Sequence, residues 1–373
     1  MTTRSLDDRA ARDDRETDDV RAARFVLGID GGGTRTRAAI VDLSGRLLGL
    51  GEGGPSNLNV SGRDGVRDAV RDAVEAARVD AVRDAGRSAG TDAGTVASDD
   101  VGSDRDQQPF AAAFLGLAGV VTPRDHAEIR SIASELGLAP DNAVGVDHDL
   151  RIALAGGLGG SAGIVLIAGT GSSCYGRTDD GATWRAGGWG PLIDDPGSGY
   201  WLGVRAMATV CRSVDGRGPA TALERALPDS LGLDSAGDLL RMTGIGGLAR
   251  ERIAALAPLV LDAADAGDAS AMRIVAEAID ELARMVEAVE RRLFAGNATM
   301  LTMTGGLTER RSFRDALERA ITARSPSVRP VASRLPPVLG AAALALASIG
   351  ALDDDIVARL EESARRRFTT TGA

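Results

Sequence analysis

Three turns of this chain combine glycine with hydroxyl-bearing residues directly after an apolar stretch. They read "IDGGGTRT" (29–36), "LIAGTGSS" (166–173) and "MTGGLTER" (303–310). Glycine lets backbone N–H groups approach a ligand closely, and threonine or serine hydroxyls can donate to phosphate oxygens. One such turn is a weak signal, because a Gly-rich turn after a strand is more often only a turn. Three of them, spread over both halves of the chain, favour phosphate binding.

Phosphoryl transfer to an alcohol also needs a cation and a carboxylate that takes the hydroxyl proton. Asp30 suits the cation, because Mg²⁺ prefers hard oxygen ligands and keeps part of its water shell; the alternative is a turn-capping side chain. Two acids in "VGVDHDLRIAL" could take the proton, Asp147 and Asp149. Strand alternation puts these two on the same side and turns His148 to the opposite face, as a structural histidine. His126, in a predicted helix, is expected to be an ordinary surface residue.

The composition limits the function classes. The 373 residues suffice for two modest domains, 44% of them are apolar, and no apolar run reaches the ~20 residues of a membrane span. The net charge of −10 argues against a nucleic-acid surface. All 43 basic residues are arginine, so a Walker-type phosphate lysine is excluded. Two cysteines are too few for a disulfide scaffold, which indicates a reducing cytoplasm.

Strand and helix patterns alternate in both halves, which predicts an α/β fold. In the first half the predicted strands are 25–29, 36–41, 47–51, 109–120 and 142–149, and the helices are 63–79 and 125–137. In the second half strands are predicted within 161–178, 181–190, 297–306 and 328–331, with helices in 197–293, from 308, and over 338–349.

Three segments carry little apolar bulk or lie at the ends. The composition of residues 1–23 predicts a disordered acidic tail without a secretory signal. The composition of residues 80–108, approximately, predicts a low-complexity surface insertion. The predicted domains are 24–154 and 155–350, with helix 338–349 packing back toward the first domain. Residues 351–373 are expected to form a C-terminal tail.

Several motifs in order resemble the BadF/BadG/BcrA/BcrD ATPase and N-acetylglucosamine kinase family, within the sugar kinase/actin/Hsp70 superfamily. They are "DGGGTRT", "GPSN", "LGLAG", "DLRIAL", "IAGTGS", "GGWG", "GSGYWLG" and "LGAAALA", and they span residues 24–347 apart from the insertion. The resemblance implies two ribonuclease H-like (actin-like ATPase) domains with an interdomain nucleotide cleft. It also implies ATP and Mg²⁺ as cofactors.

The resemblance assigns roles to individual residues. Asp30 is the expected metal ligand, and Asp149 the expected base because it is followed by a short helix, with Asp147 as the alternative. The expected nucleotide-binding residues are Gly31, Gly32, Gly33, Thr34, Thr36, Gly169, Thr170, Gly171, Ser172, Gly305, Gly306 and Leu307. The expected acceptor-binding residues are Asn57, Asp149, Gly188, Trp189, Gly190 and Asp195.

Trp189 and Pro196 lie in or near the expected acceptor motif. Trp189 has core packing as its alternative role. Relatives usually read Gly-Asp-Glu-Gly-Ser where this chain reads "DDPGS" (194–198), so Pro196 replaces a glutamate and the specificity for the sugar's C2 substituent is open. Cys174, next to the second turn, is expected to be a small semi-buried side chain rather than a nucleophile.

The resemblance implies a cytoplasmic, homodimeric enzyme that phosphorylates an amino sugar with ATP. N-acetylglucosamine, converted to its 6-phosphate, is the expected acceptor, and glucosamine or another hexose is the alternative. One rival is the ATPase activator of radical CoA-ester dehydratases, but neither Cys174 nor Cys211 lies in the glycine-framed loop that holds its iron–sulfur cluster. Another rival is a nucleotide-binding regulator without catalysis, against which Asp30, Asp149 and the "GTGS" turn argue.

Overall fold

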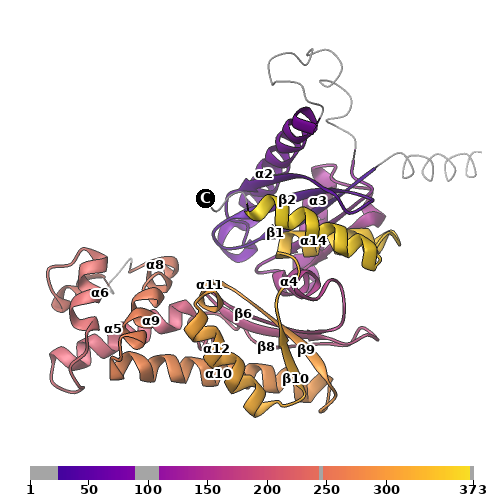
Figure 1. Cartoon of the computed structure of the whole chain (residues 1–373). Helices are drawn as coiled ribbons and strands as arrows, with labels where there is room; N and C mark the ends of the chain where they lie inside the picture. The colour runs from indigo at the N-terminus through magenta and orange to yellow at the C-terminus, as the bar shows by residue number, and fades with distance from the viewer. Residues whose placement is uncertain (1–23, 89–108, 243–246, 370–373) are drawn as a thin grey trace, which may run out of the picture. The chain divides into compact units, whose positions relative to one another are not determined.

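The computed structural model of the chain describes residues 24–88, 109–242 and 247–369 (Figure 1). The chain divides into two compact units. Unit 1 contains the chain up to Gly160 and from Arg334 onward, and unit 2 is Ser161–Ser333. The predicted boundary after residue 154 is therefore six residues early, because helix α4 (Asp149–Leu158) continues past it. The predicted tail 1–23 and most of the predicted insertion lie outside the described residues.

Unit 1 is built on a five-stranded sheet with the order β3-β2-β1-β4-β5. The strands are β1 (Phe25–Gly31), β2 (Thr36–Asp42), β3 (Leu47–Gly53), β4 (Ala112–Leu117) and β5 (Val144–Asp147). The first three strands pair antiparallel, and β4 and β5 run parallel to β1. The carboxyl ends of β1, β4 and β5 consequently lie at one edge of the sheet.

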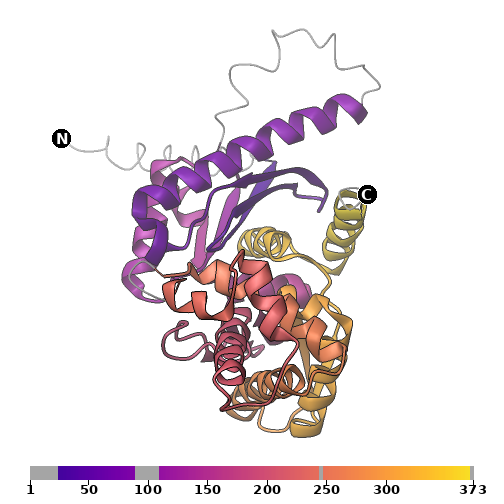
Figure 2. The same cartoon turned by 90° about the vertical axis from the view of Figure 1, so that its left-hand side faces the viewer.

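One face of this sheet is covered by helices α2 (Leu58–Ser88) and α3 (Pro123–Glu135). Figure 2 shows α2 along the sheet. Alternate residues of β3 are glycines that face α2. A Cβ atom on Gly51 would lie 2.1 Å from the carbonyl oxygen of Ala73, and Gly49 and Gly53 meet the helix backbone as closely. The sequence "LLGLGEG" therefore lets strand and helix pack backbone against backbone.

The other face is covered by α4, α13 (Pro337–Ser348) and α14 (Asp354–Thr369). Helix α13 packs on β1 and β4, as predicted for helix 338–349, and it belongs to unit 1, although the predicted boundaries included it in the second domain. Gly28 permits this contact, because a Cβ there would lie 2.4 Å from the backbone nitrogen of Ala342.

Two predicted segments need correction. The helix predicted to end near residue 79 continues to Ser88, because Asp80 accepts from the Leu50 N–H (2.9 Å) and pairs with Arg367 (3.1 Å). Residues 80–88 are therefore not part of a low-complexity insertion. The expected C-terminal tail is helix α14, whose Ile356 and Leu360 are buried.

Unit 2 repeats the architecture, with the sheet order β10-β9-β6-β7-β8. Its strands are β6 (Gly163–Ala168), β7 (Ser172–Arg177), β8 (Thr183–Gly187), β9 (Thr299–Thr304) and β10 (Val328–Val331). Counted within the unit, this is the same 3-2-1-4-5 order, with three antiparallel strands followed by two parallel ones. Both units thus have the ribonuclease H-like arrangement, which confirms the predicted fold class.

The predicted helical region 197–293 is divided into several elements. They are α5 (Gly199–Val214), α6 (Leu223–Leu231), η2 (Ala236–Asp238), α7 (Leu239–Met242), α8 (Arg250–Ala254), α9 (Ala257–Asp265) and α10 (Ala269–Leu293). Helix α10 packs on β7 and β8, and α12 (Arg311–Arg324) packs on α10. Within the described part of the chain, no helix is long and apolar enough to span a membrane.

Candidate active site

The first glycine turn joins β1 to β2 in unit 1, and neighbouring segments fix its backbone. The Ala118 N–H donates to the carbonyl of Gly31 (2.7 Å), and the Ser56 N–H donates to that of Gly32 (3.0 Å). Gly31 must be glycine, because a Cβ atom there would lie 2.2 Å from the Ser56 Oγ. Around the Cβ position of Gly33, in contrast, no atom lies within 4 Å. The backbone of Gly33 is therefore accessible to a ligand.

The two threonines of this turn differ in accessibility. Thr34 is exposed, whereas Thr36 is completely buried. The Thr36 hydroxyl donates to the Gly54 carbonyl (2.6 Å) and lies 2.7 Å from the Ser56 Oγ. Thr36 thus supports the turn from within the unit, and Thr34 is the hydroxyl that a ligand can reach.

Asp30 and Asp149 lie close enough to influence each other. Asp30 is the half-buried penultimate residue of β1, and Asp149 is the first residue of α4, where its carboxylate accepts from the Leu150 N–H (3.0 Å). Burial and the negative charge of Asp149 raise the pKa of Asp30 from 3.8 to about 6, against the positive charges of Arg37 and Arg35. Two carboxylates that repel each other in a half-buried site favour a bound cation.

Asp147 has a different environment. It is the last residue of β5 and Asp149 is the first residue of α4, so strand alternation does not decide on which side the two acids lie. One Asp147 oxygen accepts from the His148 N–H (2.8 Å) and lies 3.5 Å from the His148 Nε2 and 3.9 Å from the His126 Nε2. Both histidines of the chain therefore face this one carboxylate.

The two histidines hold helix ends in place. His148 is the N-cap of α4, and its Nδ1 accepts from the Arg151 N–H (3.2 Å), which agrees with the predicted structural role. His126, in α3, lies with its Nδ1 2.8 Å from the Thr122 carbonyl. It is half-buried and directed toward Asp147, so the prediction of an ordinary surface residue was wrong.

Asn57 lies at the start of α2, beside the loop that follows β4. Its Oδ1 accepts from the Asn59 N–H (3.0 Å), and the Leu58 N–H donates to the Ala118 carbonyl (3.2 Å). Gly119 leaves room for it, since a Cβ there would lie 2.7 Å from the Asn57 Oδ1. The loop after β4 thus contacts both Asn57 and the first glycine turn.

The second glycine turn joins β6 to β7 in unit 2 and is attached to the start of α5. The Gly199 N–H donates to the carbonyl of Gly169 (2.7 Å), and the Tyr200 N–H to that of Thr170 (3.3 Å). The Ser172 side chain is buried and donates to the Pro196 carbonyl (2.7 Å). Thr170 is exposed, so it is the hydroxyl of this turn that a ligand can reach.

The third glycine turn lies next to the second, because β6 and β9 are parallel neighbours. Gly305 has a φ of +106°, and a Cβ there would lie 2.4 Å from the Ala168 carbonyl oxygen. Gly306 has no atom within 4 Å of its Cβ position, whereas the Leu307 side chain is buried. Backbone groups of Gly305 and Gly306 are therefore the accessible part of this turn.

The predicted acceptor turn follows β8 in unit 2. The Trp189 N–H donates to the Asp194 carbonyl (3.2 Å), and the Asp194 N–H donates to that of Gly190 (2.9 Å). Gly188 has a φ of +71°. Trp189 is 66% exposed, which excludes core packing as its role in this unit.

The buried carboxylate of Asp195 accepts hydrogen bonds from two donors. Its Oδ2 lies 2.7 Å from the Nη2 of Arg250, and the Gly190 N–H also donates to its carboxylate. Burial raises the pKa of Asp195, although these two donors oppose the shift. Sequence reasoning missed Arg250, because it lies 55 residues further along the chain and in no recognisable motif.

Cys174 is completely buried in β7, and burial raises the pKa of its thiol. It therefore behaves as a core side chain and not as a nucleophile. Among the described residues, no cluster of three or more histidines, cysteines or acids could hold a metal ion alone.

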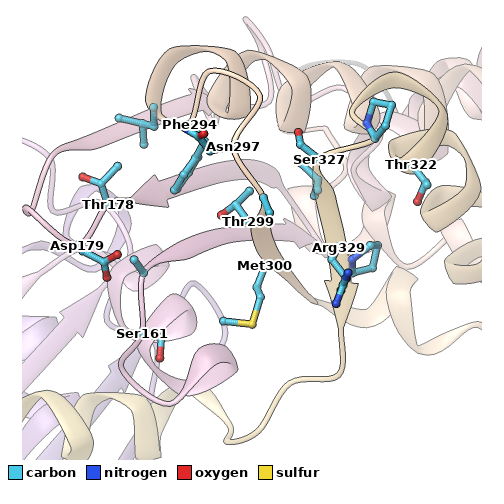
Figure 3. A pocket seen from close by; sticks show the side chains of 16 residues that line it. Ser161, Thr178, Asp179, Phe294, Asn297, Thr299, Met300, Thr322, Ser327 and Arg329 are labelled. Atoms are coloured by element: carbon cyan, nitrogen blue, oxygen red, sulfur yellow. The ribbon is translucent and has the colours of Figure 1, made fainter.

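A cavity of about 890 Å³ lies elsewhere in unit 2 (Figure 3). Thr299 and Val328, at the starts of β9 and β10, line it, together with Thr178 after β7. The glycine turns follow the opposite ends of β6 and β9. The cavity is therefore separate from the residues described above.

The fold and these turns define an actin-like ATPase class of protein. A sequence model of the BadF/BadG/BcrA/BcrD ATPase family matches residues 27–345. The chain belongs to this family.

This chain matches two relatives and one solved structure over nearly the full length of each of them. An N-acetylmuramic acid/N-acetylglucosamine kinase of Clostridium acetobutylicum is 32% identical over 86% of this chain and 98% of the relative. An N-acetyl-D-glucosamine kinase of Dictyostelium discoideum is 30% identical over 87% of this chain and 98% of the relative. The structure of a proposed N-acetylglucosamine kinase from Chromobacterium violaceum has 29% identity and a TM-score of 0.64, covering 87% of this chain and 99% of that one.

Proposed function

We propose that this protein transfers the γ-phosphoryl group of ATP to an amino sugar, and that N-acetylglucosamine is converted to its 6-phosphate. The observation that carries the proposal is the pair Asp30 and Asp149, one at the end of β1 and the other at the start of α4. The family and the two kinase relatives support the same reaction.

In this proposal Asp149 is the general base. Its carboxylate takes the proton of the sugar hydroxyl, the hydroxyl oxygen bonds to the γ-phosphorus, and the bond to the β-phosphate oxygen breaks to release ADP. Asp149 lies in the first turn of α4, where the helix dipole favours a negative charge. Each acid accepts one backbone N–H, but Asp147 fits this role less well because its oxygen also lies 3.5 Å from the His148 Nε2 and 3.9 Å from the His126 Nε2.

The carboxylate of Asp30 suits a bound magnesium ion. Mg²⁺ is bound in such enzymes by one or two carboxylates, water and substrate phosphates rather than by a protein cage, and Asp30 would supply the carboxylate, with the negative charge of Asp149 nearby. When bound, the ion would neutralise phosphate charge. We propose that the enzyme binds this ion. We also propose that it forms a homodimer and acts in the cytoplasm.

The exposed groups of the glycine turns would hold the nucleotide. In unit 1 these are Gly32, Gly33 and Thr34, and in unit 2 Thr170, Gly171 and the backbone of Gly305 and Gly306. Thr36, Ser172 and Leu307 would act through the backbone or by supporting the turns, since their side chains are buried. The interdomain position of the nucleotide stays a prediction.

The acceptor would be recognised by Asn57, by Gly188, Trp189 and Gly190, and by Asp195. An exposed tryptophan ring suits the apolar face of a sugar. By the family resemblance, Pro196 stands at a position where a glutamate is usual, so the N-acetyl group would be recognised by the remaining groups. The relative named for N-acetylmuramic acid makes that sugar the second acceptor to test.

The experiment is an ADP-release assay with ATP, Mg²⁺ and a panel of N-acetylglucosamine, N-acetylmuramic acid, glucosamine and glucose. We expect ADP release that depends on N-acetylglucosamine and is lost in Asp149→Asn. Release without any sugar would identify an uncoupled ATPase, and absence of release with intact ATP binding would identify a regulator; either result contradicts the proposal.

A further inference from the structure

Arg250 contacts both of the features of unit 2 that the proposed reaction uses. It is the first residue of α8, and its Nη2 lies 2.7 Å from the Oδ2 of Asp195, the proposed acceptor-binding acid. The Asp195 side chain is 4% exposed, whereas that of Arg250 is 35% exposed. The pair is therefore anchored inside the unit at the carboxylate and open to solvent at the guanidinium.

The same guanidinium lies against the second glycine turn. A Cβ atom on Gly171 would be 2.6 Å from the Arg250 Nη2 and 3.1 Å from the Asp195 Oδ2. Gly171 is consequently glycine because the ion pair occupies the place of a side chain. This contact puts a positive charge next to the backbone that we propose holds the nucleotide phosphates.

Arg250 has more N–H donors than it has hydrogen-bond acceptors among the described residues. A guanidinium carries five N–H donors, and among the described residues Asp195 is the one acceptor that Arg250 contacts. Its Nε is buried and has no hydrogen-bond partner there. Because the Nε is closed to solvent and the side chain as a whole is 35% exposed, the donors that an anion can reach are those on the Nη atoms. Because the chain has no lysine, arginine is the side chain that can supply a permanent positive charge.

We propose that Arg250 is a catalytic residue that donates to the oxygens of the phosphoryl group while it passes from ATP to the sugar. This inference rests on the proposed kinase function. Asp195 orients the guanidinium, and the acceptor hydroxyl still gives its proton to Asp149, so Arg250 exchanges no proton. Charge on the three equatorial oxygens of the transferring group is stabilised by such fixed donors.

A purely positioning role would give a different result. If Arg250 only holds Asp195 in place, its loss weakens sugar binding and leaves the rate at saturation unchanged. If it donates to the transferring group, its loss lowers the rate at saturation. The ratio of the effects on kcat and on the KM for sugar therefore separates the two roles.

The test uses the full chain and three variants, Arg250→Gln, Arg250→Lys and Arg252→Gln. Arg252 is an exposed arginine on the same helix, so its variant makes the same charge change away from Asp195. With ATP and N-acetylglucosamine saturating, Arg250→Gln should lower kcat by about 100-fold or more. Arg252→Gln should stay within about twofold of the unchanged protein. Arg250→Lys keeps the charge but not the planar fork, so kcat should fall by about tenfold.

A kcat within about threefold of the unchanged protein in Arg250→Gln or in Arg250→Lys would overturn the inference, even if the KM for sugar rises. If Arg250→Gln does not fold, Arg250→Lys decides. Arg250→Ala adds a readout that a structural role would not move: millimolar guanidinium ion should restore part of its kcat. Failure of the unchanged protein to phosphorylate any amino sugar would instead refute the proposed function.

Discussion

Asp30 makes the stability of the unliganded protein depend on pH. With its pKa raised to about 6, the folded chain holds a proton between about pH 4 and 6 that the unfolded chain has released. Stability should therefore fall as pH rises through this range and level off above it. The shift of roughly two pKa units corresponds to about 3 kcal/mol at most above pH 6.

Replacing Asp30 with Asn should remove this loss. We expect Asp30→Asn to be more stable than the unchanged protein above pH 6 and about equal to it near pH 4, as measured by urea unfolding without nucleotide or Mg²⁺. The variant should also be inactive. A stability difference that is constant across this pH range would contradict the electrostatic account.

The second residue-scale prediction separates the two acids after β5. Asp149→Asn should bind ATP nearly normally and lose about 100-fold or more in kcat, the usual scale for loss of a general base. Asp147→Asn should lose less than about tenfold, because Asp147 is occupied by His148 and His126. Steady-state kinetics with saturating substrates measures both, and the reverse order would make Asp147 the base.

At the scale of single residues, sequence reasoning named candidate positions, and their roles in binding and catalysis stay predictions. It identified Asp30, Asp149 and the glycines from their types and from family resemblance. It could not show that Thr36 and Ser172 are buried, since that depends on Ser56 and Pro196, which fold over them. Arg250 was beyond its reach, because only the tertiary structure brings it to Asp195.

At the scale of elements, the first turn of α4 carries the proposed base and depends on its cap. His148 caps this helix through its Nδ1. His148→Ala should therefore cost about 1 kcal/mol of unfolding free energy. His148→Asn should cost less than half as much, because asparagine is a preferred N-cap residue. Urea unfolding at pH 7 compares them, and equal losses would show that the cap is unimportant.

The contact between β3 and α2 gives a second prediction at this scale. Gly51→Ala would place a Cβ 2.1 Å from the Ala73 carbonyl oxygen, so strand and helix must separate. We expect a loss of about 1–3 kcal/mol, the usual cost of overpacking. Gly54→Ala is the control, since no atom lies within 4 Å of its Cβ position. Comparable thermal stability of the two variants would argue against this close contact.

Element types were easier to predict from the sequence than element ends. The strands were predicted because they are short apolar runs, three of which, β1, β6 and β9, lead into glycine turns. The end of α2 was missed because residues 80–88 look like the low-complexity stretch after them, whereas Asp80 and Asp84 pair with Arg367 and Arg46. Helix α14 was missed because its charged sequence hides the buried Ile356 and Leu360.

At the scale of the whole molecule, the chain contains the same ribonuclease H-like unit twice, with the second unit inserted before α13. Each unit places glycine turns at the carboxyl ends of its parallel strands. Family resemblance implied this duplication, and the alternation of strands and helices in both halves agreed with it, but the predicted boundary after residue 154 lies six residues before the end of the first segment of unit 1. The packing of helix 338–349 on the first domain was predicted from family resemblance, and α13 does pack on β1 and β4 of unit 1.

The central claim is that the protein phosphorylates an amino sugar with ATP. The most direct measurement is ³¹P NMR of a reaction containing the full chain, ATP, Mg²⁺ and N-acetylglucosamine. We predict that ADP and a sugar phosphomonoester accumulate in equal amounts, with coupling to the two C6 protons that identifies the 6-phosphate. Accumulation of ADP with inorganic phosphate in place of the phosphomonoester, or no turnover with N-acetylglucosamine or N-acetylmuramic acid, would contradict it.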